Sequence, residues 1–190
     1  TGGAKNIGRS ISLTLAAAGA SVAINTLASH EAAEEVAGEI RAAGGDADVF
    51  LADIANAEAV SAMGEAVMKR FGKVDILVLN ASQRREVLFK DMTFEQWRNT
   101  MSITLDGSFH CIKACLPSML ANHGGNIITL AGDSVLFGGN RKSHNTTAKS
   151  GLVGLTRALA KELAADGIRV HCVSTGSINT ERPAHRSARA

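Results

Sequence analysis

Short apolar runs and longer segments with helical spacing alternate along the chain. The apolar runs are continuous, which is typical of strands buried in a parallel sheet, and they occupy residues 20–25, 46–53, 74–80, 125–132 and 168–175. Between them, apolar residues recur at helical spacing, as on the face that carries Leu152, Leu155, Leu159 and Leu163. Strands that alternate with helices indicate a parallel sheet covered on both faces. We therefore predict an α/β fold, a doubly wound parallel sheet in three α/β/α layers, with residues 1–190 as a single domain.

A glycine-bearing loop, TGGAKNIG, opens the sequence and leads into a helical pattern over residues 9–19. Glycines let a backbone approach a pyrophosphate closely, and the helix, from about Ile7, would offer free N–H groups and a positive dipole end. The alternative is an ordinary tight turn between a strand and a helix. At the head of a strand–helix series, the loop favours a dinucleotide-binding domain of Rossmann type. Because such a loop normally follows the central strand, we also expect a strand before Thr1 and further chain beyond Ala190.

Composition restricts the partners of the protein. The 190 residues are 45% hydrophobic and 20% charged, and the net charge of +2 is too small to favour nucleic acid or an anionic membrane. No apolar run approaches the ~20 residues that span a bilayer. Cys111, Cys115 and Cys172 are an odd number without metal-type spacing, so we predict no metal site. Cys111 and Cys115 lie four apart in an apolar helical pattern, which predicts buried thiols and suits a reducing, cytoplasmic location.

Five motifs follow one another along the chain: TGGAKNIG, ADI at 52–54, LNAS at 79–82, TLDGSFHCIKACLPSML at 104–120 and STGSINTERP at 174–183. Together they resemble the short-chain dehydrogenase/reductase (SDR) family, especially its 3-oxoacyl-carrier-protein reductase-like branch, over essentially the whole chain. The first motif is similar to T-G-x-x-x-G-x-G, with Asn6 in place of the middle glycine. The resemblance implies an NAD(P)-dependent oxidoreductase that acts on a carbonyl or alcohol of a small-molecule substrate.

The resemblance also implies which residues hold the cofactor. Asp53 matches an aspartate that holds the adenine, and the whole implied set is Gly2, Lys5, Ile7, Gly8, Asn25, Asp53, Ile54, Asn80, Ala81, Lys149, Gly176, Ile178 and Thr180. Residues 25–30 contain no Asp or Glu to hold the ribose 2′-hydroxyl of NAD. Lys5 stands where members that prefer NADP often carry a basic residue, whereas Leu27 stands where many of them place arginine. NADP is favoured and NAD is the alternative, because Lys5 could instead be a solvated loop lysine.

The catalytic residues that the family uses are mostly replaced. Members of the family use a serine together with the tyrosine and lysine of Y-x-x-x-K. Here Lys149 matches the lysine, Asn145 stands at the tyrosine position and Gly132 stands at the serine position. Thr104 replaces the family's helix asparagine, and the chain contains no tyrosine. A positioned general acid contributes roughly 10²–10⁴ in rate, so these replacements bear directly on activity.

Three nearby side chains are candidates for the missing proton donor. Ser134 lies two residues after the serine position, and Lys149 could donate a proton if burial lowered its pKa. His144 titrates near neutrality, but neighbours on a helix point about 100° apart, which favours a surface or interface histidine over a catalytic one. Asp133 is better explained as a loop hydrogen-bonding residue than as a base.

Two functions therefore remain open. One is an SDR oxidoreductase with a non-standard active site, and the other is a cofactor-binding pseudoenzyme with a structural or regulatory role. Retention of Lys149 supports cofactor binding more than catalysis, because the family lysine also holds the nicotinamide ribose. The resemblance also implies a homodimer or homotetramer, because family members commonly pair through the helix after Asn145 and the long helix that carries Cys111 and Cys115. The small residues Gly151, Gly154 and Ala158 on the first of these helices would permit close helix–helix approach.

Overall fold

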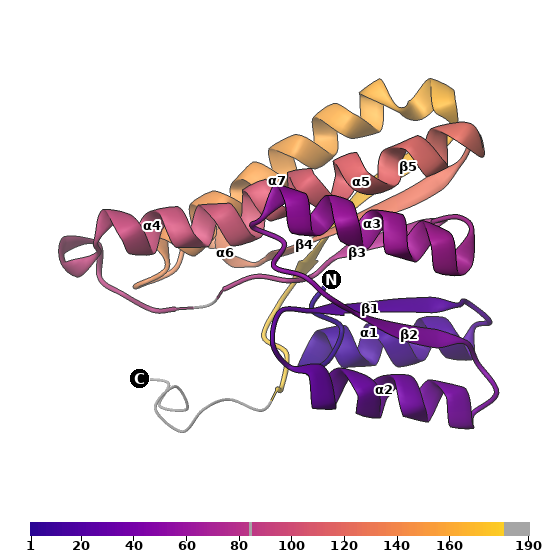
Figure 1. Ribbon diagram of the computed structural model, residues 1–190. Helices are drawn as coiled ribbons and strands as arrows, with labels where there is room; N and C mark the ends of the chain where they lie inside the picture. Colours follow the sequence, from indigo (N-terminus) through magenta and orange to yellow (C-terminus); the bar gives the residue numbers. More distant parts are fainter. Residues whose placement is uncertain (84, 181–190) are drawn as a thin grey trace.

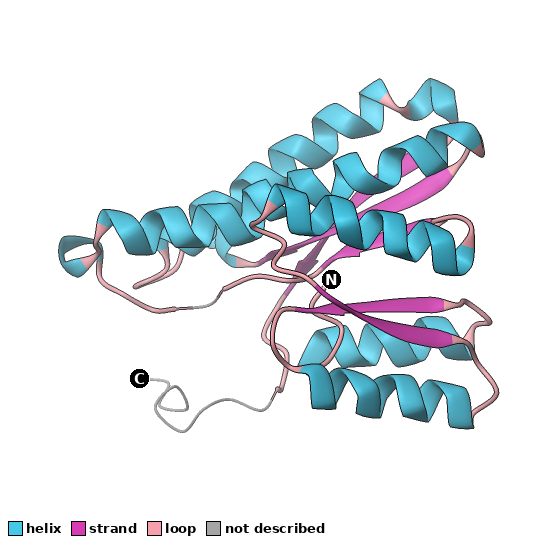
Figure 2. Ribbon diagram, in the orientation of Figure 1, coloured by secondary structure: helices cyan, strands magenta, loops and turns pink. Residues whose placement is uncertain are grey.

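The computed structural model describes residues 1–83 and 85–180, which form an α/β fold (Figures 1 and 2). The strands are β1 (Val22–Thr26), β2 (Ala47–Leu51), β3 (Ile76–Leu79), β4 (Gly125–Gly132) and β5 (Ile168–Thr175). The α-helices are α1 (Asn6–Ala17), α2 (His30–Ala42), α3 (Ala57–Phe71), α4 (Phe94–Met101), α5 (Gly107–Ala121), α6 (Ser134–Phe137) and α7 (Ser143–Glu162). All five predicted strands are present, so the predicted fold class is confirmed.

Every strand pairing in the described residues is parallel, and the strands form two hydrogen-bonded sets. β1 pairs with β2, while β3, β4 and β5 pair in that order. Residues 1–3 run between the two sets: the Thr1 amino group donates to the Val78 carbonyl at 2.7 Å, and the Gly3 N–H donates to the Asn25 carbonyl at 3.0 Å. A cavity of about 420 Å³ lies between β1 and β3. The strands are therefore ordered around a central position, as the sequence predicts.

Helices cover the two faces differently (Figure 1). α1 and α2 pack on one side of β1 and β2, whereas α3, α5 and α7 lie on the opposite side. Two apolar cores result, and each lies between helices and strands. The first is centred on Ile24 and Val36. The second, which is larger, includes Met119, Ile127 and Ile168, all almost fully buried.

Local chemistry sets several element boundaries. The Asn56 side chain accepts from the Ala59 N–H at 3.0 Å and caps α3, and Gly72 ends that helix with a left-handed φ of 79°. Thr93 and Gln96 form a capping box at the start of α4. The sequence predicts a single long helix over residues 93–120. The structure inserts a π-helical segment, Ser102–Asp106, between α4 and α5.

The three cysteines are free thiols; Cys111 is buried as predicted, whereas the prediction of a buried thiol is wrong for Cys115, which is only half-buried. Burial raises the pKa of the Cys111 and Cys115 thiols to about 11. The thiolate is the reactive form, so neither sulfur is poised for chemistry near neutral pH. Among the described residues, no helix has the length and apolar character needed to cross a membrane.

Candidate active site

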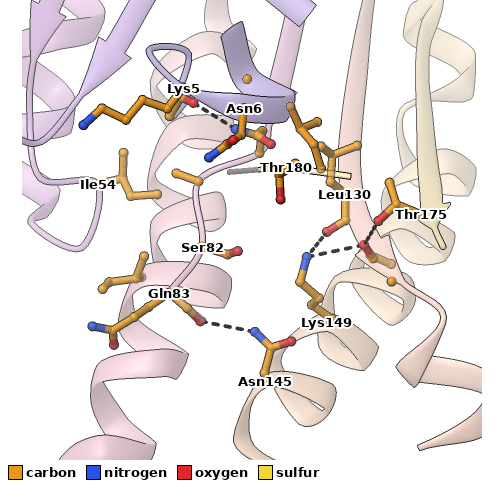
Figure 3. A pocket seen from close by; sticks show the side chains of 18 of the residues that line it. Lys5, Asn6, Ile54, Ser82, Gln83, Leu130, Asn145, Lys149, Thr175 and Thr180 are labelled. Atoms are coloured by element: carbon orange, nitrogen blue, oxygen red, sulfur yellow. Dashed lines mark hydrogen bonds between the residues drawn. The ribbon is translucent and has the colours of Figure 1, made fainter. Parts of the chain in front are cut away.

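A cleft of about 640 Å³ runs along the carboxyl ends of the strands (Figure 3). This is where open parallel sheets bind ligands. It extends from the glycine loop, past the ends of β1 and β3, to the end of β4 and the first turns of α7. The predicted site residues that line it are Gly2, Lys5, Ile7, Gly8, Asn25, Asp53, Ile54, Asn80, Ala81, Ser134, Asn145, Lys149, Gly176 and Thr180. The fold thus brings nearly all of the predicted set into one groove.

The glycine loop is held by Asn80. The Asn80 side-chain amide donates to the carbonyls of Thr1 and Gly2, both at 3.0 Å. A Cβ atom on Gly8 would lie only 1.9 Å from the Gly2 carbonyl oxygen, so the closed loop requires glycine there. Asn6, in place of the family's middle glycine, adopts a left-handed φ of 50°, a conformation that asparagine tolerates better than most residues.

The first helix after the loop leaves its N-terminal donors available. Lys5 precedes α1 with no side-chain capping hydrogen bond, and the first turn carries no acidic residue. The first N–H groups of a helix lack intrahelical partners and bear a partial positive charge. A phosphate group in this cleft would therefore meet unpaired donors of the right polarity.

The ends of β1 and β2 form the next part of the wall. The Asn25 side chain is buried and donates to the carbonyls of Phe50 at 3.3 Å and Ala52 at 3.1 Å, so its amide ties the two strands together. The Asp53 carboxylate accepts from the Ala55 N–H at 2.9 Å and so holds the turn that follows β2. Both residues shape the wall of the cleft as well as lining it.

One face of α7 forms the other end of the cleft. Lys142, Asn145 and Lys149 line it, at positions that helical spacing places on one side. The Lys149 ammonium donates to the Leu130 carbonyl at 2.8 Å and to the Ala131 carbonyl at 3.4 Å, which fixes it beside the end of β4. The Asn145 amide nitrogen donates to the Gln83 carbonyl at 3.2 Å (Figure 3).

The serine position offers space and a nearby hydroxyl. A Cβ atom on Gly132 would meet only the Thr175 carbonyl oxygen at 3.8 Å and the Ser134 hydroxyl oxygen at 4.0 Å. Those distances are ordinary van der Waals contacts, so a side chain could be accommodated at position 132. Ser134, one of the candidate donors, places its hydroxyl next to that space.

Two predicted positions differ in the structure. His144 is only 1% exposed and is not among the residues that line the cleft, so the expected surface position is wrong and the catalytic alternative lacks geometric support. Ile178 lines an adjoining depression, together with Lys5, Ile7 and Thr180, instead of the main cleft.

Sequence reasoning missed Gln83, Glu86 and Lys142, which also line the cleft. Glu86 and Lys142 approach each other to 3.7 Å. One signal for Lys142 was available, because it precedes Asn145 by three residues and shares its helical face. The described residues contain no group of three or more His, Cys, Asp or Glu side chains that could hold a metal ion, so no described feature contradicts the metal-free expectation.

The family model for short chain dehydrogenases matches residues 1–189 of the chain. The chain belongs to the short-chain dehydrogenase/reductase family. Its similarity to 3-oxoacyl-[acyl-carrier-protein] reductases is 39% identity to FabG of Staphylococcus aureus over 178 residues, 94% of this chain and 72% of that protein. The Synechocystis enzyme of that name is 36% identical over 181 residues, 95% of this chain and 73% of the relative.

Two further proteins are similar to the chain. The BbsD subunit of (2S)-[(R)-hydroxy(phenyl)methyl]succinyl-CoA dehydrogenase from Thauera aromatica is 37% identical over 180 residues, 95% of this chain and 72% of that protein. The crystal structure of a putative short-chain alcohol dehydrogenase from Sinorhizobium meliloti superposes with a TM-score of 0.91 at 33% identity, covering 98% of this chain and 72% of the other. The SDR chain therefore spans about 72% of the length of these relatives.

His144 makes the stability of this SDR protein depend on pH. Burial lowers the pKa of His144, and the backbone of Arg85 opposes this only in part. Because its pKa is lower in the native state, the ring takes up a proton more readily in the unfolded chain as pH falls below about 6.5, so the free energy of unfolding should decrease towards pH 5. Urea unfolding between pH 5 and 8 should show this slope, and His144→Leu should flatten it. An unchanged slope in that variant, or an equal flattening in the exposed control His171→Gln, would contradict the assignment.

Proposed function

We propose that the protein is an NAD(P)-dependent oxidoreductase that acts on a carbonyl or alcohol substrate with a non-standard active site. The observation that carries the proposal is the continuity of the cleft, which joins the glycine loop at one end to Lys149 and Asn145 at the other (Figure 3). Relatives named as 3-oxoacyl reductases and as a hydroxyacyl-CoA dehydrogenase subunit support a carbonyl or alcohol as the reacting group. Membership of the SDR family supports oxidation or reduction as the type of reaction.

The residues present fit a nicotinamide dinucleotide. Gly2, Gly8 and the uncapped start of α1 would receive the pyrophosphate, and Asp53 with Ile54 would hold the adenine. At the other end Lys149 would hold the nicotinamide ribose, with Asn80, Ala81, Gly176 and Thr180 along the path. When bound, the reduced cofactor supplies the hydride. The absence of Asp and Glu from residues 25–30, and exposed Lys5 beside the loop, favour NADP over NAD.

The chain's own residues do little to supply a proton. Asn145 has no titratable proton, and Gly132 has no side chain. Lys149 and Ser134 line the same cleft and can donate a hydrogen bond, and the Ser134 hydroxyl lies 4.0 Å from where a Cβ on Gly132 would stand. We expect slow turnover of simple ketones, because both the general acid and the oxyanion donor of the family are replaced. The remaining contribution to the rate is the orientation of the substrate against the cofactor.

A second candidate function is a cofactor-binding pseudoenzyme with a structural or regulatory role. The hydrogen bond from the Asn145 amide to the Gln83 carbonyl favours it, because the residue at the tyrosine position is engaged with the protein instead of directing a donor into the cleft. Every cofactor-side feature described above is compatible with this role. Turnover measurements separate the two candidates.

The proposed association is a homodimer or homotetramer through α7 and the long helix. Gly154 on α7 has no atom within 4 Å of its would-be Cβ, so this face is open to close approach, and Phe109 on α5 is 52% exposed. Gly151, in contrast, packs against Leu105 of its own chain. Light scattering at micromolar concentration should give at least a dimer, and Gly154→Arg should shift it towards monomer. A native protein that is entirely monomeric would contradict the proposal.

Lys5→Glu should weaken binding of NADPH about tenfold more than binding of NADH, equivalent to about 1.4 kcal/mol. The reason is that only NADPH carries a phosphate on the adenine ribose. Fluorescence titration with both reduced cofactors measures the two dissociation constants. Lys161→Glu, an equal charge change at the exposed end of α7, is the control and should leave the ratio unchanged. Equal weakening of both cofactors by Lys5→Glu would show that Lys5 does not select the phosphate.

The double substitution Asn145→Tyr with Gly132→Ser should raise ketone reduction by about 10²-fold or more. It restores the donor pair of the family beside Lys149, and the open space at position 132 accepts the serine. NADPH oxidation with an acetoacetyl thioester measures the rate. Adding Lys149→Ala to the double variant should abolish the gain, because the new phenol would lose its cationic neighbour. If the unmodified protein already turns over ketones at rates typical of the family, the pseudoenzyme candidate fails, and Ser134→Ala is the first variant to assay.

A further inference from the structure

The orientation of the Asn145 amide is fixed by its partner. Its Nδ2 atom lies 3.2 Å from the backbone carbonyl oxygen of Gln83. A carbonyl oxygen can only accept a hydrogen bond, so the nitrogen of the amide must face it. Rotating the amide by 180° would place two oxygens against each other. The side-chain oxygen Oδ1 therefore occupies the other position.

The partner of Asn145 is itself held. The Asn99 side chain of α4 donates to the Oε1 atom of Gln83, and the Val87 N–H donates to the Arg141 carbonyl at 2.9 Å. The first contact anchors Gln83 to α4, and the second ties its segment to the residues that lead into α7. The Gln83 carbonyl is thus a fixed acceptor, and it imposes one orientation on Asn145.

The Asn145 oxygen is left as an unfilled acceptor on the cleft wall. Asn145 is 7% exposed and lines the cleft, and no donor among residues 1–83 and 85–180 makes a hydrogen bond to Oδ1. Figure 3 shows this oxygen on the side of the amide away from Gln83. An acceptor that faces the cleft without a protein donor pairs favourably with a ligand group that supplies one, and unfavourably with another acceptor.

We propose that this end of the cleft binds a ligand group that donates a hydrogen bond, a hydroxyl, in preference to a ketone oxygen of the same shape. The inference rests on the proposed function in taking this cleft as the ligand site. A ketone oxygen placed against Oδ1 would leave two acceptors facing each other, whereas a hydroxyl pairs with it. A tyrosine hydroxyl at this position would donate a hydrogen bond to a substrate carbonyl, whereas Asn145 Oδ1 can only accept one.

The test compares cyclohexanol with cyclohexanone, which match in size and differ in hydrogen-bonding character. Saturation-transfer NMR with cofactor-free protein gives both dissociation constants, and no hydride transfer can occur. The alcohol should bind about 10-fold more tightly to the native protein, the effect of one additional hydrogen bond. Asn145→Leu should bring the two constants to within about twofold, and Asn145→Ala serves the same purpose if the leucine variant melts early. Thr147→Ala, an exposed position on α7, is the matched control and should keep the preference.

The outcomes separate this inference from the proposed function. Equal binding, a ketone preference, a preference that survives in both Asn145 variants, or no binding of either probe at millimolar concentration would overturn it. Loss of NADPH binding with an intact alcohol preference would overturn the cofactor assignment alone. Binding of NADPH without an alcohol preference would leave the proposed function standing and remove only the polarity assigned to Asn145.

Discussion

The structure depends on the way residues 1–8 connect the two sets of strands. Thr1 pairs with β3 and Gly3 pairs with β1, while Asn80 holds the loop through the carbonyls of Thr1 and Gly2. The tight approach of Gly8 to Gly2 then sets where α1 begins. The same few hydrogen bonds therefore fix the relative position of the strands and the floor of the cleft. Binding and folding share these contacts, because a displaced loop would disturb both.

The two ends of the cleft have different chemical character. At the glycine loop the backbone supplies donors: the start of α1 is uncapped, and Lys5 adds an exposed positive charge. At α7 the ammonium of Lys149 is directed onto the carbonyls at the end of β4, and Asn145 is directed onto Gln83. The first end suits an anionic dinucleotide. The second end is where the chain departs from the SDR pattern, and the departure changes which hydrogen-bonding groups the wall presents.

The sequence predicts the parts of the fold that depend on local pattern. The bounds of β4 and β5 match the predicted runs, because continuous apolar residues between turn signals leave few alternatives. The motifs at 52–54, 79–82 and 174–183 contribute residues to one cleft, because they lie at the ends of β2, β3 and β5 and parallel strands end at one edge. Gln83 was missed because it acts through its backbone carbonyl. Every residue type has this group, so the sequence gives no signal for it. His144 was misplaced for a related reason: helical rotation turned it away from the cleft, but no local pattern showed that another part of the chain covers it.

The π-helical segment Ser102–Asp106 has a consequence for the cleft. A π segment carries one residue more than the α-helical turn it replaces, and each residue of an α-helix turns the chain by about 100°. This additional residue therefore sets the rotation of α4 about the helix axis relative to α5. Asn99 lies on α4 and holds Gln83, which in turn orients Asn145 across the cleft. The π segment itself borders the cleft, because Ile103 lines it. The helical register that it sets places Asn99 against Gln83, and Gln83 in turn holds the amide of Asn145.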